Sequence, residues 1–254
     1  MTKEHNKEEI GMTLEDAKLF VSENRYPVKG KRFISRCIDG RYKNEEGLPA
    51  LAIPGADLGQ MAVIFSAANR YGFEVDGKKA LDTLIEVVGG KANFRTHTDS
   101  HHEGKGFAKG CGHWGQVLKD KDAYGITEEQ IEFINRELKG IGEQVILEGN
   151  HSESAVFIIK GSWGILPRFK NSSAFMYHQS LVDERNRELA EKLLEKGAVT
   201  LKNNEGVEWL YEALSEVTTT HLLETSNRLA KGLPIYDVNF KDDGSFTIDF
   251  RENV

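Results

Sequence analysis

Short apolar segments alternate with longer segments of helical periodicity along most of this chain. Strand-like segments are expected at residues 31–38, 92–97, 144–149 and 154–161. Helices are expected at residues 13–24, 57–71, 77–88, 110–118, 127–138, 172–196 and 206–231. This alternation is typical of proteins in which helices cover a largely parallel sheet. We therefore predict an α/β fold, a single domain with a mixed, mainly parallel central sheet flanked by helices.

Local signals place several element ends. Thr13 is expected to cap the first helix, with Asp16 three residues later, and Asp57 to cap the helix after Pro54-Gly55. Asp242-Asp243-Gly244 interrupts an alternating stretch and predicts a C-terminal hairpin. Residues 164–167 are expected to be irregular.

The sequence contains no internal repeat, low-complexity stretch or evident linker. We therefore predict one catalytic domain at residues 13–254, preceded by a mobile N-terminal arm at residues 1–12.

Composition excludes several classes of function. The formal net charge is −7 and no basic block occurs, so the chain is not expected to bind nucleic acid. No apolar run is long enough to span a bilayer, and the polar N-terminus lacks the apolar core of a signal peptide. A cytoplasmic location is the resulting expectation. In a reducing compartment, two cysteines are expected to be metal ligands or catalytic thiols rather than a disulfide.

The two cysteines lie in segments that suit a metal site. Cys37 lies at the C-terminal end of a predicted strand, and Cys111 has three histidines within the fourteen residues before it. Two thiolates and one imidazole are good ligands for zinc or a similar soft divalent ion, and they leave a fourth position open. The alternatives are two unrelated buried thiols, or a structural site closed by a fourth protein ligand.

Asp39 and Arg41 follow Cys37 on a predicted turn, where their side chains can converge. A neighbouring guanidinium keeps a carboxylate ionised and oriented. Such a carboxylate beside the open metal position can accept a hydrogen bond from a bound water. The alternative is an ordinary surface ion pair, which contributes little.

The segment Cys37-Ile38-Asp39-Gly40-Arg41 resembles the Cys-x-Asp-x-Arg motif of beta-class carbonic anhydrases and of their zeta-class, cadmium-type relatives. The beta class continues with His-x-x-Cys, but no cysteine lies three residues after His97. The zeta class separates its histidine and second cysteine by a longer loop, which the ten-residue spacing from His101 to Cys111 resembles. The resemblance therefore indicates a zeta-like enzyme.

This resemblance implies reversible hydration of carbon dioxide to bicarbonate. Cys37, His101 and Cys111 would hold zinc, or alternatively cadmium, with water or hydroxide as the fourth ligand. Asp39 would accept the hydrogen bond of the hydroxide, and Arg41 would orient Asp39. Among beta-class relatives the aspartate can also close the site by binding the metal. The resemblance leaves the oligomeric state open, because beta-class enzymes are commonly dimers or larger and zeta-class units can act as monomers.

Three histidines compete for the single imidazole position. The spacing favours His101, whereas His97 ends a predicted strand and His102 is adjacent. His113 follows Cys111 by two residues, which leaves a place near the metal open to it, but a histidine at a helix start is more often solvated, and this is the expectation.

Two other functions remain open from the sequence. A cysteine activated by a histidine would make a metal-free nucleophilic enzyme. A fourth protein ligand would make a non-catalytic zinc-binding protein.

Overall fold

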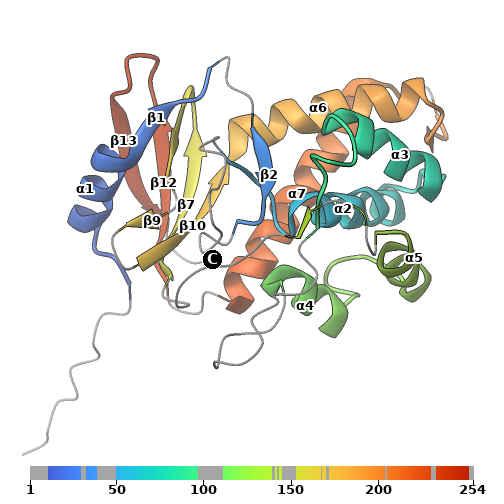
Figure 1. Cartoon of the computed structure of the whole chain (residues 1–254), viewed down its shortest axis with the longest axis horizontal. Coiled ribbons are helices and arrows are strands. Elements are labelled where there is room, and N and C mark those ends of the chain that lie inside the picture. Colours follow the sequence, from blue (N-terminus) through green and yellow to red (C-terminus); the bar gives the residue numbers. More distant parts are fainter. Residues whose placement is uncertain are drawn as a thin grey trace, which may run out of the picture.

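The computed structural model describes residues 11–29, 33–38, 50–96, 111–138, 141, 143–144, 153–166, 168–169, 172–203, 205–229 and 233–251. Within this part of the chain, a central sheet separates an N-terminal helix from a larger group of helices (Figure 1). The predicted α/β class is confirmed. No helix in the described ranges is long and apolar enough to cross a membrane.

The central sheet has five strands in the order β13-β12-β7-β10-β9. Their bounds are Phe246–Arg251, Ile235–Phe240, Glu153–Lys160, Ser172–His178 and Arg168–Phe169. The inner strands β12, β7 and β10 are parallel, and an antiparallel strand pairs at each side. The sheet is therefore mixed, as predicted, and β12 and β13 form the predicted hairpin around Asp242-Asp243-Gly244.

Strand β10 corrects one prediction. Residues 172–196 were expected to form one helix, but they contain β10 followed by helix α6, Gln179–Glu195. The residues from Ala174 to Tyr177 are all buried, each at most 4% exposed. A short apolar run covered on both sides fits an inner parallel strand, and periodicity alone does not distinguish it from a buried helix.

A second correction concerns the stretch expected to be irregular. Residues 163–165 form β8, Trp163–Ile165, which pairs antiparallel with β1, Arg25–Pro27. Strand β9 follows β8 closely in the chain. Residues 163–165 form a strand because they pair with β1, which is distant in the sequence. The local sequence contains no signal for this pairing.

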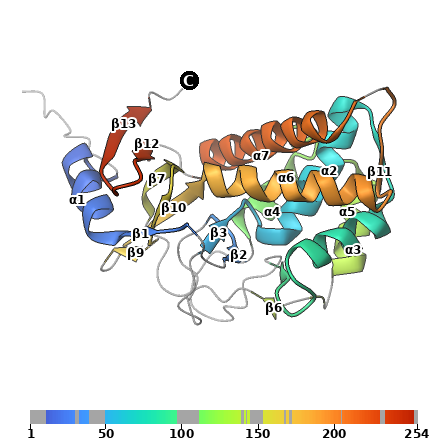
Figure 2. The ribbon, with the colours of Figure 1, turned by 90° about the horizontal axis from the view of Figure 1, so that it is seen from above.

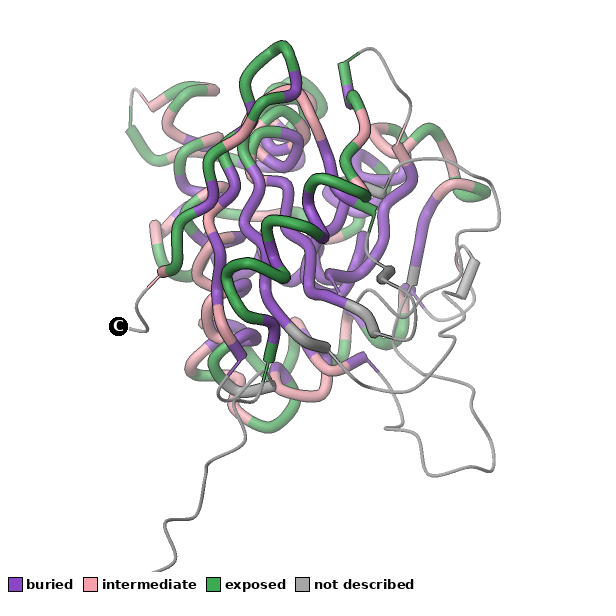
Figure 3. Tube along the Cα trace, turned by 90° about the vertical axis from the view of Figure 1, so that its left-hand side faces the viewer, coloured by how far each residue is buried: buried purple, intermediate pink, exposed green. Residues whose placement is uncertain are grey.

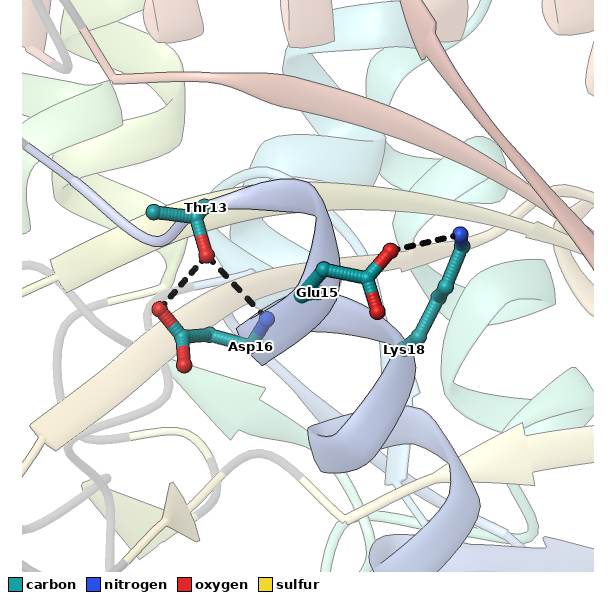
Figure 4. Close-up of polar contacts among 4 residues, drawn as sticks. All are labelled: Thr13, Glu15, Asp16 and Lys18. Carbon is teal, nitrogen blue, oxygen red and sulfur yellow. Dashed lines mark hydrogen bonds and ion pairs between the residues drawn. The ribbon is translucent and has the colours of Figure 1, made fainter.

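Helix α1, Leu14–Asn24, covers one side of the sheet, where Phe20 contacts Phe157 of β7 with ring centroids 5.3 Å apart. Its predicted cap is confirmed. The Thr13 hydroxyl accepts a hydrogen bond from the backbone N–H of Asp16 at 3.2 Å and donates one to its carboxylate at 2.7 Å (Figure 4). The predicted arm at residues 1–12 and domain at residues 13–254 stay predictions, since residues 1–10 lie outside the described ranges.

The other helices gather beyond β10, where α6 and α7 run side by side (Figure 2). Their bounds are α2 Ala56–Tyr71, α3 Gly77–Val87, α4 Gly112–Lys119, α5 Glu128–Leu138 and α7 Val207–Leu229. Every residue of α2 from Ala56 to Ala68 is buried, as its apolar circumference predicts. At the far end of this layer, β4 (Glu74–Val75) pairs with β11 (Val199–Thr200).

Two short parallel pairs lie outside the central sheet. They are β2, Ile34–Arg36, with β3, Ala50–Ala52, and β5, Arg95–Thr96, with β6, Glu143–Gln144. The Met176 N–H of β10 donates to the Ile38 carbonyl at 3.1 Å, which ties the end of β2 to the central sheet. Buried residues follow the inner strands and helices, while exposed residues follow the outer turns (Figure 3).

Candidate metal centre

Cys37 is held at the end of β2 by backbone hydrogen bonds on both sides. The Arg36 carbonyl accepts from the Ile53 N–H at 2.9 Å, and the Ile38 carbonyl accepts from Met176. Cys37 itself is only 2% exposed. The predicted strand therefore delivers Cys37 into the interior, between β3 and β10.

Cys111 is the N-cap residue of α4, and it is also 2% exposed. Its sulfur accepts a hydrogen bond from the backbone N–H of Trp114 at 3.5 Å, while its carbonyl accepts from Gly115 at 2.8 Å. A helix N-terminus favours negative charge, so this position suits a thiolate.

The two sulfur atoms lie 4.0 Å apart, although the residues are 74 positions apart in the sequence. A disulfide would need a separation of about 2.05 Å. Two sulfurs bound to one tetrahedral zinc ion at about 2.3 Å would lie about 3.8 Å apart. The observed spacing therefore fits two thiolate donors to one soft divalent ion, and the two cysteines are brought together as the sequence predicts.

The electrostatics of the pair also suit a metal. Burial raises the pKa of the Cys111 thiol well above its ordinary value, and the neighbouring Cys37 raises it further. Backbone N–H groups of Trp114 and His113 oppose this rise. A divalent cation between the two sulfurs would instead lower the pKa of the thiols, because its charge stabilises thiolates directly.

The remaining members of the predicted site lie outside the described residues. They are Asp39, Arg41 and the preferred histidine His101, together with the alternatives His97 and His102. Among the residues that the structure does describe, no group of three or more His, Cys, Asp or Glu side chains could hold a metal ion. The structure thus gives the positions of Cys37 and Cys111, two of the three predicted ligands. The third donor and the Asp–Arg pair stay predictions.

His113 corrects an expectation, because it is buried rather than solvated. It is 1% exposed, and its Nδ1 lies 2.7 Å from the Thr225 hydroxyl of α7. The ring also fills the space beside Gly55, where an added Cβ would come within 2.8 Å of His113 Cδ2. The burial follows from α4 packing against α7, which a local helix-start pattern does not reveal.

Sequence reasoning missed His221 of α7, which lies next to His113 with ring centroids 5.4 Å apart. Its Nε2 is 3.1 Å from the Tyr124 carbonyl, which can only accept, so Nε2 carries the proton. Burial lowers the pKa of His221 to about 4, so this ring is neutral at pH 7. His221 and Thr225 are four residues apart and therefore lie on one face of the helix. This spacing was the signal in the sequence from which the position of His221 could have been predicted.

The comparisons with known proteins give a structural likeness but no sequence relative. No family model and no curated protein matches the chain. The structure is similar to the cadmium-bound domain 2, with acetate, of a carbonic anhydrase from the marine diatom Thalassiosira weissflogii. The sequence identity is 19%, the TM-score is 0.42, and the match covers 72% of this chain and 86% of that one. The resemblance inferred from the sequence is to the same kind of protein, a cadmium-type carbonic anhydrase.

Proposed function

We propose that this protein is a metal-dependent lyase, a carbonic anhydrase that interconverts carbon dioxide and bicarbonate. Cys37, His101 and Cys111 would hold zinc, or alternatively cadmium. The observation that carries the proposal is the 4.0 Å approach of two buried cysteines, the only two in the chain. One of them opens the segment that resembles the Cys-x-Asp-x-Arg motif.

Each residue of the proposed site has a distinct task. The two thiolates would offset the charge of a divalent ion, and the buried backbone around them would hold their spacing. Such an ion, when bound, lowers the pKa of a coordinated water to about 7 and so supplies a nucleophile at neutral pH. Asp39 would accept the hydrogen bond of that nucleophile and orient it toward carbon dioxide. Arg41 would keep Asp39 ionised and in place.

The metal-free alternative is disfavoured by the environment of the thiols. A nucleophilic cysteine needs a lowered pKa and access to substrate. Cys111 has a raised pKa, and both cysteines are 2% exposed. This pair is therefore better suited to binding a metal than to direct attack on a substrate.

The test is metal analysis combined with stopped-flow hydration of carbon dioxide on the full chain. We expect one equivalent of zinc or cadmium per chain and hydration activity that rises from neutral to alkaline pH. Loaded protein without activity across that range would overturn the enzymatic proposal and leave the non-catalytic zinc protein.

Cobalt substitution separates an open site from a closed one. We expect small anions to change the absorption spectrum of the cobalt protein, because they would displace the exchangeable ligand. A spectrum insensitive to anions would indicate four protein ligands and contradict the proposed chemistry.

A further inference from the structure

His113 is a buried side chain two residues after Cys111, in the first turn of α4. Its Nδ1 shares a hydrogen bond of 2.7 Å with the hydroxyl of Thr225, which lies on α7 and is also 1% exposed. The Tyr124 hydroxyl lies 3.3 Å from the same oxygen, and the rings of Tyr124 and His113 meet edge to face with centroids 5.4 Å apart. One threonine hydroxyl therefore joins α7 to α4 beside the second cysteine.

The Thr225 hydroxyl is used differently from the other threonine hydroxyls of α7. Those each donate a hydrogen bond of 2.7–3.0 Å to the backbone carbonyl four residues earlier; they belong to Thr218, Thr219 and Thr220. Such a bond stays within its own helix and holds no other element in place. Among the described residues, the Thr225 hydroxyl bonds only to His113 and Tyr124. Its contacts therefore serve the packing of α7 against the segment that carries Cys111.

Another edge of the His113 ring packs against the turn that begins α2. Gly55, rather than Asp57 as the sequence suggested, is the N-cap residue of α2, and its φ is 77°. A Cβ at Gly55 would come within 2.8 Å of His113 Cδ2, so the missing side chain lets the ring approach the backbone. A Cβ at Gly59, one turn later, would lie 3.5 Å from the same atom. The ring thus contacts both α7 and the start of α2.

The turn before α2 is hydrogen-bonded to the backbone beside the first cysteine. The Ile53 carbonyl accepts a hydrogen bond from the Ala56 N–H at 2.9 Å, and the Ile53 N–H donates one to the Arg36 carbonyl at 2.9 Å. Arg36 is the last residue of β2 and directly precedes Cys37. His113 therefore packs against a turn that is anchored beside Cys37, while its own helix begins at the other cysteine.

We propose that His113 and Thr225 position Cys111 against Cys37, so that the two sulfurs stay 4.0 Å apart and can bind one ion. In this role His113 is a positioning residue, which acts through the cysteines rather than by binding the ion. A buried polar group that loses its partner is costly, so the pair holds α4 and α7 in one arrangement. The inference rests on the metal centre of the proposed function and assigns a role to two buried residues outside the predicted ligands.

The test measures the zinc affinity of full-length variants by competition with a chromophoric chelator. Thr225→Val removes the hydroxyl at nearly constant volume and is expected to weaken zinc binding about tenfold. Thr225→Ser keeps the hydroxyl and is expected to retain most of the affinity. Wild-type zinc affinity in Thr225→Val would overturn the proposal.

His113→Asn decides the question if Thr225→Val does not fold. Asparagine keeps a hydrogen-bonding atom near the position of Nδ1, but it lacks the part of the ring that packs on Gly55. We expect this variant to bind zinc severalfold more weakly than wild type. Unchanged affinity in His113→Asn would overturn the proposal.

Thr218→Val is the matched control. Thr218 lies on the same helix and is 1% exposed, and its hydroxyl donates to the Leu214 carbonyl at 2.7 Å and accepts from Asn186 Nδ2 of α6 at 3.2 Å. The control therefore loses buried hydrogen bonds on α7, but none to α4. We expect lower thermal stability, with zinc affinity and the cobalt spectrum like wild type. A loss of affinity as large as in Thr225→Val would indicate general destabilisation and overturn the positioning role.

Hydrogen exchange in metal-free protein separates this inference from the proposed function. The Trp114 N–H donates to the Cys111 sulfur and the Gly115 N–H to the Cys111 carbonyl, so their exchange rates report how firmly the start of α4 is held. We expect both protons to exchange about tenfold faster in Thr225→Val than in wild type, Thr225→Ser and Thr218→Val. Equal rates in all four proteins would sink the positioning role. Wild-type protein that binds no metal, with the difference in exchange present, would sink the proposed function alone.

Discussion

Cys37 Sγ and Cys111 Sγ lie 4.0 Å apart in the interior, one at the end of β2 and the other at the start of α4. The two elements have other partners, because β2 pairs with β3 and α4 packs against α7. The elements around β2 and α4 therefore set the distance between the two sulfur atoms. Metal binding tests whether this distance suits two ligands of one ion.

Replacing either cysteine by serine is expected to abolish stoichiometric zinc binding. A hydroxyl is a much weaker ligand than a thiolate, and two remaining donors hold a soft ion poorly. Metal content after gel filtration measures the loss, and carbon dioxide hydration should fall to the buffer rate. Ser66→Ala serves as control, since it removes a buried hydrogen bond to the Tyr124 carbonyl without touching a sulfur. Full zinc content in both serine variants would contradict the metal centre.

The free energy of unfolding is expected to fall as the pH drops from about 6.5 to about 4. Burial lowers the pKa of both His221 and His178 from 6.5 to about 4 in the folded protein. In that window the unfolded chain binds protons that the folded chain does not, so acid favours unfolding. Each histidine contributes up to about 3 kcal/mol over the window.

Urea denaturation at several pH values measures this dependence, and His221→Gln isolates one contributor. Glutamine retains an N–H donor for the Tyr124 carbonyl but does not titrate. The variant should therefore lose about half of the pH dependence. If the free energy of unfolding of the variant depends on pH as steeply as that of the wild type, His221 does not titrate as the structure implies.

Two helical glycines should respond in opposite ways to alanine. A Cβ at Gly59 of α2 would lie 1.6 Å from the Pro54 carbonyl oxygen, so Gly59→Ala must displace the helix from the preceding turn. We expect a loss of about 2 kcal/mol or more. A Cβ at Gly115 of α4 meets nothing within 4 Å. Gly115→Ala should therefore stabilise by about 0.5–1 kcal/mol, because alanine has the higher helix propensity. Thermal unfolding of both variants makes the comparison.

The N-cap of α1 should contribute more to the free energy of unfolding than the exposed ion pair on the same helix. Thr13→Ala removes the side-chain acceptor for the Asp16 N–H and is expected to cost about 1 kcal/mol. Lys18→Ala removes the exposed pair between Lys18 and Glu15, for which we expect less than about 0.5 kcal/mol. Equal losses in urea denaturation would mean that the cap does not anchor α1.

The sequence by itself determined features whose causes are local. Thr13 and Asp16 cap α1 through neighbouring atoms, and Asp242-Asp243-Gly244 closes the β12–β13 hairpin through the geometry of a short turn. The placement of Cys37 at a strand end and of Cys111 at a helix start also follows from local patterns. The pairing of these cysteines as metal donors was predicted from residue type and family resemblance.

Only the tertiary structure decided features that depend on distant partners. Residues 172–178 form β10 because β7 pairs with them, although their apolar run also suits a helix. His113 is buried because α7 covers it, and Asp57 turns inward because β5 offers it a backbone N–H. The 4.0 Å sulfur spacing is of the same kind. Contacts between segments far apart in the chain set each of these, and a local pattern carries no information about which segments will meet.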